Sequence, residues 1–283
     1  MVENFKLQQI QELYAAGFCM ASDRTYHYFS EIEEYEKQPK PFYLLTIYDA
    51  QGNAIRRIKT GSSKGLQRTT WDFRYTAGNI DAGDDGGSSY KVLPGEYKAG
   101  LHKFEDGVFT ELAKPVSFKA VALNWVTLPA TDQKALQDFA ARVNELRRVA
   151  DGTYTYYQQL NERLGKIKTA IIAAPAVPLT ISQQADALQK RLDSINMQFA
   201  GDGSLARRQF ETLPGILDRI GTIANGLWNN SSAPTTTAQQ SFELANKQFS
   251  TVYKAVKDVD AAIKQLQQQL EQLQGWSSFY HLH

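Results

Sequence analysis

The sequence has little of several features that would identify a function. A single cysteine, Cys19, among 283 residues excludes an internal disulfide framework and leaves the redox compartment open. The 31 Lys and Arg residues nearly balance the 30 Asp and Glu residues, so no overall charge selects nucleic acid or an anionic membrane as a partner. No apolar run approaches the roughly 20 residues that a membrane-spanning helix needs. The sequence therefore predicts neither a nucleic-acid-binding protein nor a membrane span.

Motifs that carry known chemistry are also missing. The sequence has no G-x-S-x-G nucleophile elbow, no H-E-x-x-H zinc motif and no phosphate-binding loop. The stretch GDGSLA, residues 201–206, matches a dinucleotide fingerprint by letters, but it follows a predicted helix instead of a strand. His27 and His102 have no partner at ligand spacing, and His281 and His283 are expected to fray. We therefore predict no catalytic residue, no resident metal and no cofactor.

Three acidic residues form a weak candidate set for calcium. Asp81, Asp84 and Asp85 lie in a Gly-rich stretch, and carboxylates in a flexible loop suit this hard cation. Their spacing fits no EF-hand, and such stretches are also common in solvated loops. We expect a solvated loop, with calcium binding as the alternative.

The first half of the chain has the pattern of a small β domain. From Phe42 to Lys119 apolar residues alternate with polar ones, and turns are expected at residues 51–53 and at Asp106-Gly107. Strands are expected on both sides of each turn, and a further strand is expected in GLQRTTWDFRY, which ends at Tyr75. The stretch 76–92 is too rich in Gly, Asp and Ser to bury anything, and we expect it to be a long surface loop that carries any local function. The pattern predicts an antiparallel immunoglobulin-like sandwich.

The stretch WDFRY, residues 71–75, invites both a propeller and a catalytic interpretation. A propeller would repeat its Trp-Asp signature in every blade, and this sequence has one Trp-Asp dipeptide. In a strand, Trp71, Phe73 and Tyr75 share one face, and Asp72 and Arg74 share the other. We therefore expect three aromatic rings in the core and a solvated ion pair outside.

The second half has the pattern of long helices. Apolar residues recur about every 3.5 residues, the spacing of a coiled-coil seam. Two long segments and one shorter segment follow this spacing: Leu136, Phe139, Val143, Leu146, Ala150, Thr153, Tyr157, Leu160, Leu164, Ile167 and Ile171; Phe242, Ala245, Phe249, Val252, Val256, Val259, Ile263, Leu266, Leu270 and Leu273; and Ile181, Ala185, Leu188, Leu192, Ile195 and Phe199. The predicted helices are residues 132–173, 181–199, 213–228 and 236–274. Thr180 and Thr236 are candidates for capping boxes at two of the helix starts.

These lengths predict an α+β chain of several parts. Residues 1–38 have an uncertain fold, residues 39–125 form the β-sandwich, and residues 130–276 form an elongated antiparallel bundle of three legs whose middle leg is broken. The alternative is that the seams pair between chains as a coiled-coil oligomer, so the oligomeric state stays open.

The β half resembles a known module in a specific set of positions. An apolar strand ending in Asp-Ala-x-Gly, a strand with Arg, a Gly before Trp-Asp, and Pro-Gly-x-Tyr occur here as Asp49, Ala50, Gly52, Arg56, Gly65, Trp71, Asp72, Pro94, Gly95 and Tyr97. This pattern resembles the immunoglobulin-like module of the flagellar hook-capping protein FlgD and of many exported bacterial proteins. With the helices that follow, the chain is similar over about residues 40–275 to the C-terminal region of sortilin-like, BNR-repeat propeller proteins, which often carry a glycosyl hydrolase label.

The resemblance implies a non-catalytic structural or protein-interaction part of a larger exported protein. The chain lacks the propeller, so no catalytic residue is carried over, and residues 1–38 would be a remnant of the connection to it. The implied partner is the propeller itself or another exported protein. The alternatives are a contribution to a glycoside hydrolase and a carbohydrate-binding accessory module, so a glycan remains a possible ligand. The first residues predict no secretory signal, and both a cytoplasmic protein and a piece of a periplasmic, cell-surface or secreted protein fit that pattern.

Overall fold

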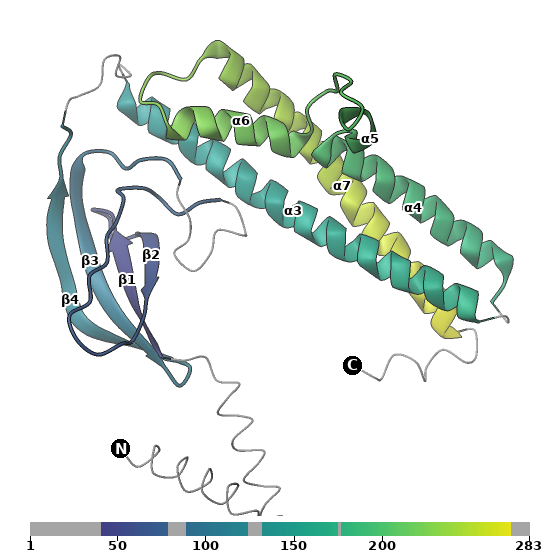
Figure 1. Ribbon diagram of the computed structural model, residues 1–283, viewed down its shortest axis with the longest axis horizontal. Helices are drawn as coiled ribbons and strands as arrows, with labels where there is room; N and C mark the ends of the chain where they lie inside the picture. The colour runs from purple at the N-terminus through teal and green to yellow at the C-terminus, as the bar shows by residue number, and fades with distance from the viewer. Residues whose placement is uncertain (1–40, 79–88, 124–131, 175–176, 273–283) are drawn as a thin grey trace, which may run out of the picture.

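The chain forms an antiparallel β-sheet followed by long helices, as the α+β prediction states (Figure 1). The computed structural model describes all residues except 1–40, 79–88, 124–131, 175–176 and 273–283. The N-terminal segment 1–38 and the calcium candidates Asp81, Asp84 and Asp85 lie outside the described residues. Figure 1 shows the sheet on one side, the helices on the other, and α3 running the length of the helical part.

The sheet has four strands in the order β2-β1-β3-β4, and all neighbouring strands are antiparallel. The strands are β1 (Phe42–Tyr48), β2 (Ala54–Thr60), β3 (Gly95–Glu105) and β4 (Val108–Ala120). The two central strands, β1 and β3, are separated in the sequence by residues 49–94, more than half of the β part. The long connection between β2 and β3 therefore crosses one face of the sheet, where Trp71, Tyr75 and Val92 pack on the core.

Both turns predicted from the sequence are present, and the backbone explains their residues. Asp106 and Gly107 have φ angles of 51° and 78°, so the β3–β4 hairpin uses two successive left-handed residues. Gly52 has a φ of 87° in the β1–β2 turn. There the Asp49 carboxylate accepts a hydrogen bond from the backbone N–H of Asn53 at 2.8 Å. Asp49 and Gly52 of the sequence motif are thus turn-forming residues.

The strand predicted in residues 65–75 is wrong. Residues 61–73 form no strand, and only an isolated bridge joins Arg74 to Lys91. The physical reason is Phe73, whose φ of 59° is left-handed and interrupts an extended backbone. Trp71 still packs on the sheet, with its ring 5.6 Å from that of Tyr97 and 5.9 Å from that of Phe118.

Strand β4 is an exposed edge that is protected against pairing with another strand. The β3–β4 register is irregular on both sides of Leu101, and it leaves Leu112, Lys114 and Pro115 of β4 without a cross-strand partner. Bulges, lysine and proline are the usual devices that block edge pairing, since proline has no N–H to donate. They matter here because β4 exposes large apolar side chains, among them Val108, Phe109 and Val116.

Removing these devices is expected to make the protein self-associate. The double variant Lys114→Val/Pro115→Val restores an N–H and removes a charge at the edge, so sedimentation and light scattering should show larger particles than the parent chain gives. Thr110→Val, which also adds an exposed apolar side chain to β4, is the control and should stay like the parent. Equal association of both variants would show that apolar area, and not edge protection, governs solubility.

The helices lie close to their predicted ranges. They are α3 (Gln133–Ala173), α4 (Leu179–Ala200), the short α5 (Gly203–Ala206), α6 (Ile216–Trp228) and α7 (Thr236–Gln272). Helix α3 begins after Asp132, whose carboxylate accepts from the N–H of Ala135 at 2.9 Å. Among the described residues, no helix combines the length and apolar character that crossing a bilayer requires.

The predicted seams form the core of the helical part. Every seam residue named above from α4 is buried, as is every described one from α7, and in α3 only Leu136 is partly exposed. Helix α3 contacts α4, α6 and α7, and both α4 and α6 contact α7. The seams therefore cover one another within a single chain, which removes the need for a coiled-coil partner.

The capping-box prediction is wrong at both helix starts. Helix α4 begins after Pro178 with no side-chain cap, two residues ahead of Thr180 in the sequence. At the start of α7 the capping hydroxyl belongs to Thr235, whose Oγ1 accepts from the N–H of Ala238 at 3.2 Å. Because consecutive threonines precede α7, the sequence pattern cannot tell which one stops being helical.

Candidate functional site

The sheet and the helices are joined by a guanidinium group. One nitrogen of Arg74, Nη1, donates to the carbonyl of Ser89 at 2.7 Å and to the carbonyl of Trp228 at 3.0 Å. Trp228 is the last residue of α6, where a helix leaves carbonyl groups without intrahelical partners and favours a cation. The side chain of Arg74 therefore links the 71–75 segment to a helix end. The predicted ion pair with Asp72 is present at 4.0 Å, but the Arg74 side chain is only 21% exposed, so the pair is not fully solvated.

The ends of the 76–92 segment are held against α3 by polar contacts. The Ser89 hydroxyl donates to Asn144 Oδ1 at 3.0 Å, and Asn144 Nδ2 donates to the carbonyl of Thr76 at 3.3 Å. Gly78 approaches so closely that a Cβ there would lie 2.3 Å from the carbonyl oxygen of Asn144. Ser89 is completely buried, at 0% exposure. The prediction that this segment buries nothing is thus wrong for its ends, and its centre lies outside the described residues.

A cleft of about 770 Å³ lies beside these links, between the sheet and the helices. Its sheet side includes Val92, Leu93 and Pro94, and its helix side includes Leu136 and Leu227. The exposed residues that follow β4, among them Leu123, also line it. Ligand sites of this size often occur where two parts of a protein meet. The cleft is therefore the candidate functional site.

Phe73 stands in the cleft in a strained conformation. Its φ of 59° is rare for a bulky residue, and its side chain is 47% exposed. The ring lies 4.9 Å from that of Trp71, and the Phe73 carbonyl accepts from the N–H of Val92 at 2.9 Å. Backbone strain persists only where surrounding contacts hold it, and it concentrates at sites that clamp ligands. The structure thus places Phe73 in the lining of the cleft with its side chain partly exposed, where the sequence predicted a core residue.

The polar groups of the cleft are mostly uncharged. Gln133, Gln137, Asn230 and Ser231 line it together with Asp72 and Lys91. The Asp72 carboxylate accepts from the N–H of Arg74 at 3.2 Å, and it lies 4.0 Å from the Arg74 guanidinium. Asp72 is the one carboxylate among the described residues that line the cleft.

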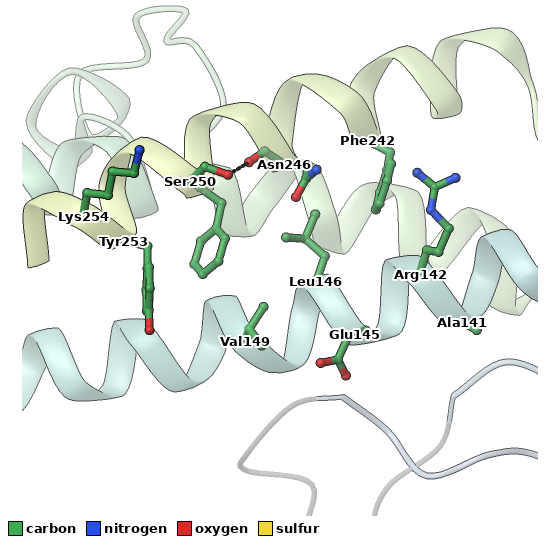
Figure 2. Close-up of a pocket in the computed structure, with 11 residues that line it drawn as sticks. Ala141, Arg142, Glu145, Leu146, Val149, Phe242, Asn246, Ser250, Tyr253 and Lys254 are labelled. Carbon is green, nitrogen blue, oxygen red and sulfur yellow. Dashed lines mark hydrogen bonds between the residues drawn. The ribbon is translucent and has the colours of Figure 1, made fainter. Parts of the chain in front are cut away.

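A second hollow, of about 720 Å³, lies between α3 and α7. Figure 2 shows Phe242 and Tyr253 reaching from α7 toward α3, and Leu146 and Val149 reaching from α3 toward α7. The salt bridge from Arg142 to Glu243, at 3.1 Å, joins the two helices at the same end as Phe242. The hollow follows the seam of two packed helices, and the Ser250 hydroxyl in its lining donates to the carbonyl of Asn246 in the same helix at 2.9 Å.

Apart from the turn-forming residues Asp49 and Gly52, the motif residues predicted from the sequence separate into two groups. Trp71, Tyr97 and Gly95 support the core of the β part: the ring of Trp71 packs on Tyr97, and Gly95 begins β3. Asp72 and Pro94 line the cleft. Among the described residues, no group of three or more His, Cys, Asp or Glu could hold a metal ion.

The residues that build the junction were not predicted. The sequence pattern placed Arg74 in solvent, and it predicted no contact for Ser89 or Asn144. Asn144 follows the seam residue Val143 directly, so nothing in the helical spacing marks it as a contact to a distant loop. No local sequence pattern predicts such a contact, because the two residues that form it come from stretches far apart in the sequence.

Buried tyrosines make the β part sensitive to alkaline pH. Burial raises the pKa of Tyr97 to about 12, from an ordinary value of 10.0, and burial also raises the pKa of Tyr75 and of Tyr90. A raised tyrosine pKa means that the fold favours the neutral phenol. The contribution to stability is therefore complete below pH 10, and it is lost as the pH rises through the folded pKa.

We expect the free energy of unfolding, measured by denaturant titration at a series of pH values, to fall between pH 10 and about 12. Tyr97→Phe should be less stable at neutral pH by about 1 kcal/mol, because it loses the hydrogen bond from the hydroxyl to the Leu93 carbonyl. Its alkaline decline should be shallower than that of the parent chain. The same decline in both proteins would assign the effect to other groups.

Comparison of the chain with family models, with curated proteins and with solved structures found no match. The cleft and the contacts that build it are therefore the features of the molecule that bear on its function. These contacts come from the 71–78 and 89–94 segments, from α3 and from the end of α6.

Proposed function

We propose that this chain is a non-catalytic module that binds another protein, as the C-terminal part of a larger exported protein with a sortilin-like, BNR-repeat propeller. The observation that carries the binding role is the cleft between sheet and helices, which leaves Phe73 and Leu123 exposed. Exposed apolar side chains gathered at a concave site are typical of protein interaction surfaces. The proposal that the chain belongs to an exported protein with a propeller is supported by the sequence motif that runs from Asp49 to Tyr97.

We propose that the β part is an immunoglobulin-like sandwich whose second layer is irregular. The Tyr97 hydroxyl donates at 2.6 Å to the carbonyl of Leu93, four residues upstream, which is the geometry of the tyrosine corner of such sandwiches. Trp71 and Val92, from the segments that would form the second layer, pack on the same core cluster as Tyr97. In the helical part, α4 and α6 would together make one leg of a three-legged bundle, broken at α5.

Catalysis by this cleft is disfavoured by its chemistry. Hydrolysis of glycosides ordinarily uses a pair of carboxyl groups about 5 to 9.5 Å apart, and the described lining of the cleft contains Asp72 alone. Carbohydrate binding without hydrolysis is the second candidate, because the exposed ring of Phe73 is a surface on which a sugar can stack. The many aliphatic side chains around it count against a sugar, since they would leave sugar hydroxyl groups without partners.

The proposal that the chain is part of an exported propeller protein can be tested by sequencing the DNA upstream of the codon for Met1. A reading frame that continues upstream into propeller repeats is the expected result. A ribosome-binding site directly before Met1 would contradict the proposal that the chain is part of an exported propeller protein.

Calorimetric titration with oligosaccharides tests the binding role against its second candidate. Cellotetraose, chitotriose and maltotriose are expected to give no saturable heat with the purified chain, and none should be hydrolysed on prolonged incubation. Saturable heat with one of them, lost in Phe73→Asn, would replace the protein-binding role with a carbohydrate-binding one.

A further inference from the structure

We propose that the cleft between sheet and helices binds an extended, uncharged peptide segment with apolar side chains. The proposal rests on the protein-binding function above and names the chemistry of the partner. Four features of the cleft favour such a peptide: its apolar lining, its balance of charges, its side-chain amides and the ordered ring of Phe73.

The apolar lining comes from both sides of the cleft and is mostly aliphatic. Val92, Leu93 and Pro94 line it from the β part, and Leu136 and Leu227 line it from the helices. Aliphatic surface gains free energy when another apolar side chain removes it from water, at about 25 cal/mol per Å². A sugar or a nucleotide would instead lose hydration at its hydroxyl or phosphate groups without replacement partners. The lining therefore selects apolar side chains.

The charges of the cleft favour a neutral occupant. Asp72 lies 4.0 Å from the Arg74 guanidinium, and Lys91 lines the same cleft. The lining therefore presents neither a surplus carboxylate for a cationic ligand nor a cluster of cations for an anionic one.

Two side-chain amides at the cleft match the polar groups of a peptide backbone. Gln137 donates through Nε2 to the Tyr75 hydroxyl at 3.3 Å, and its Oε1 accepts no hydrogen bond within the described part of the chain. Asn230 accepts through Oδ1 from the N–H of Ser232 at 3.0 Å, and within the same part of the chain its Nδ2 donates to nothing. One amide thus offers an acceptor and the other a donor, which is what an extended peptide needs at each residue.

Phe73 gives the site a fixed, partly exposed apolar surface. One side of the ring lies against Trp71, and the backbone is held by the Val92 N–H, so the ring is ordered before a ligand arrives. A peptide that packs on this ring loses little side-chain entropy of the protein on binding. This accounts for a strained left-handed backbone at a bulky residue, which a purely structural role would not require.

The test is a selection of peptides followed by measurement on matched variants. The full chain is immobilised and used to select from a random peptide library displayed on phage, and the selected consensus is synthesised with blocked ends and titrated by calorimetry. Phe73→Asn removes the ring with a residue that tolerates left-handed φ, and Leu123→Glu adds a charge at a position that is 72% exposed. Leu66→Glu, at a position that is 98% exposed and outside the cleft, is the matched control.

We expect a consensus of uncharged residues with apolar side chains at alternate positions. Each cleft variant should weaken its binding about tenfold or more, which corresponds to 1.4 kcal/mol, and Leu66→Glu should bind like the parent chain. Selected peptides that bind both cleft variants as tightly as the parent chain would overturn the cleft as the binding site. A consensus rich in charged residues would overturn the proposal of an uncharged peptide. In either case the protein-binding function would still stand. A selection that enriches nothing, with saturable heat from an oligosaccharide, would overturn both.

Discussion

Gly215→Ala is expected to lower the free energy of unfolding by about 3 kcal/mol or more, as measured by urea denaturation. Gly215 precedes α6, and a Cβ there would lie 2.3 Å from the carbonyl oxygen of Phe199 and 2.8 Å from the backbone nitrogen of Gly201. These atoms belong to the backbone at the end of α4, so they cannot rotate away as a side chain would. The two helices would have to separate, although Phe199 is among the most deeply buried side chains of the core.

The conformation of Gly215 makes this prediction mainly steric. Its φ is −63°, which alanine adopts without strain, so apart from the up to about 1 kcal/mol by which alanine is the poorer N-cap, the loss of stability comes from the close approach of α4 and α6. Gly221→Ala, within α6, is the control, because a Cβ at Gly221 meets nothing within 4 Å. That variant should gain up to about 1 kcal/mol from helix propensity. Equal denaturation midpoints for the two variants would contradict the packing described here.

Arg74→Met is expected to cost about 2 to 3 kcal/mol and to uncouple the sheet from the helices. Methionine keeps the apolar stem of arginine and removes the donor, so the carbonyls of Ser89 and Trp228 lose the partner that they share. The loss is large because the donor is charged and because Trp228 ends a helix.

Two measurements separate this effect from a general loss of stability. Hydrogen exchange of the backbone amides around Ser89 should accelerate more than exchange in the middle of α3, and thermal unfolding should broaden or split into two steps. Arg57→Met, on the exposed side of β2, changes the same residue type away from the junction and should leave both readouts unchanged. Uniform acceleration of exchange throughout the chain would show that Arg74 does not link the two parts selectively.

The helical part was predictable because its buried residues recur at a regular spacing along the sequence. The seam from Phe139 to Ile171 repeats without a slip, and each of its residues is buried in α3. The two tight turns were predictable for a related reason, since Gly52 and the Asp106-Gly107 pair supply left-handed φ angles that few other residues adopt. In both cases the information is local.

The third strand and the cleft could not be predicted, because their information is not local. The alternation of Trp71, Phe73 and Tyr75 is the pattern of a strand, but contacts with Val92 and Trp71 hold Phe73 in a left-handed conformation. The composition of the 76–92 segment predicted a solvated loop, and this was wrong at Gly78 and Ser89. These small residues instead permit a close approach to α3. A site assembled from several separate segments has no signature in any one of them.

The length of α3 has a mechanical consequence. At about 1.5 Å per residue, its 41 residues span roughly 60 Å without a break. Its first turns line the cleft, and at its far end Ile172, in its last turn, and Leu179, the first residue of α4, are exposed to solvent. The helix therefore acts as a rigid spacer between the cleft and these exposed apolar residues, so that a ligand bound in the cleft, as proposed, would be held far from the distal end.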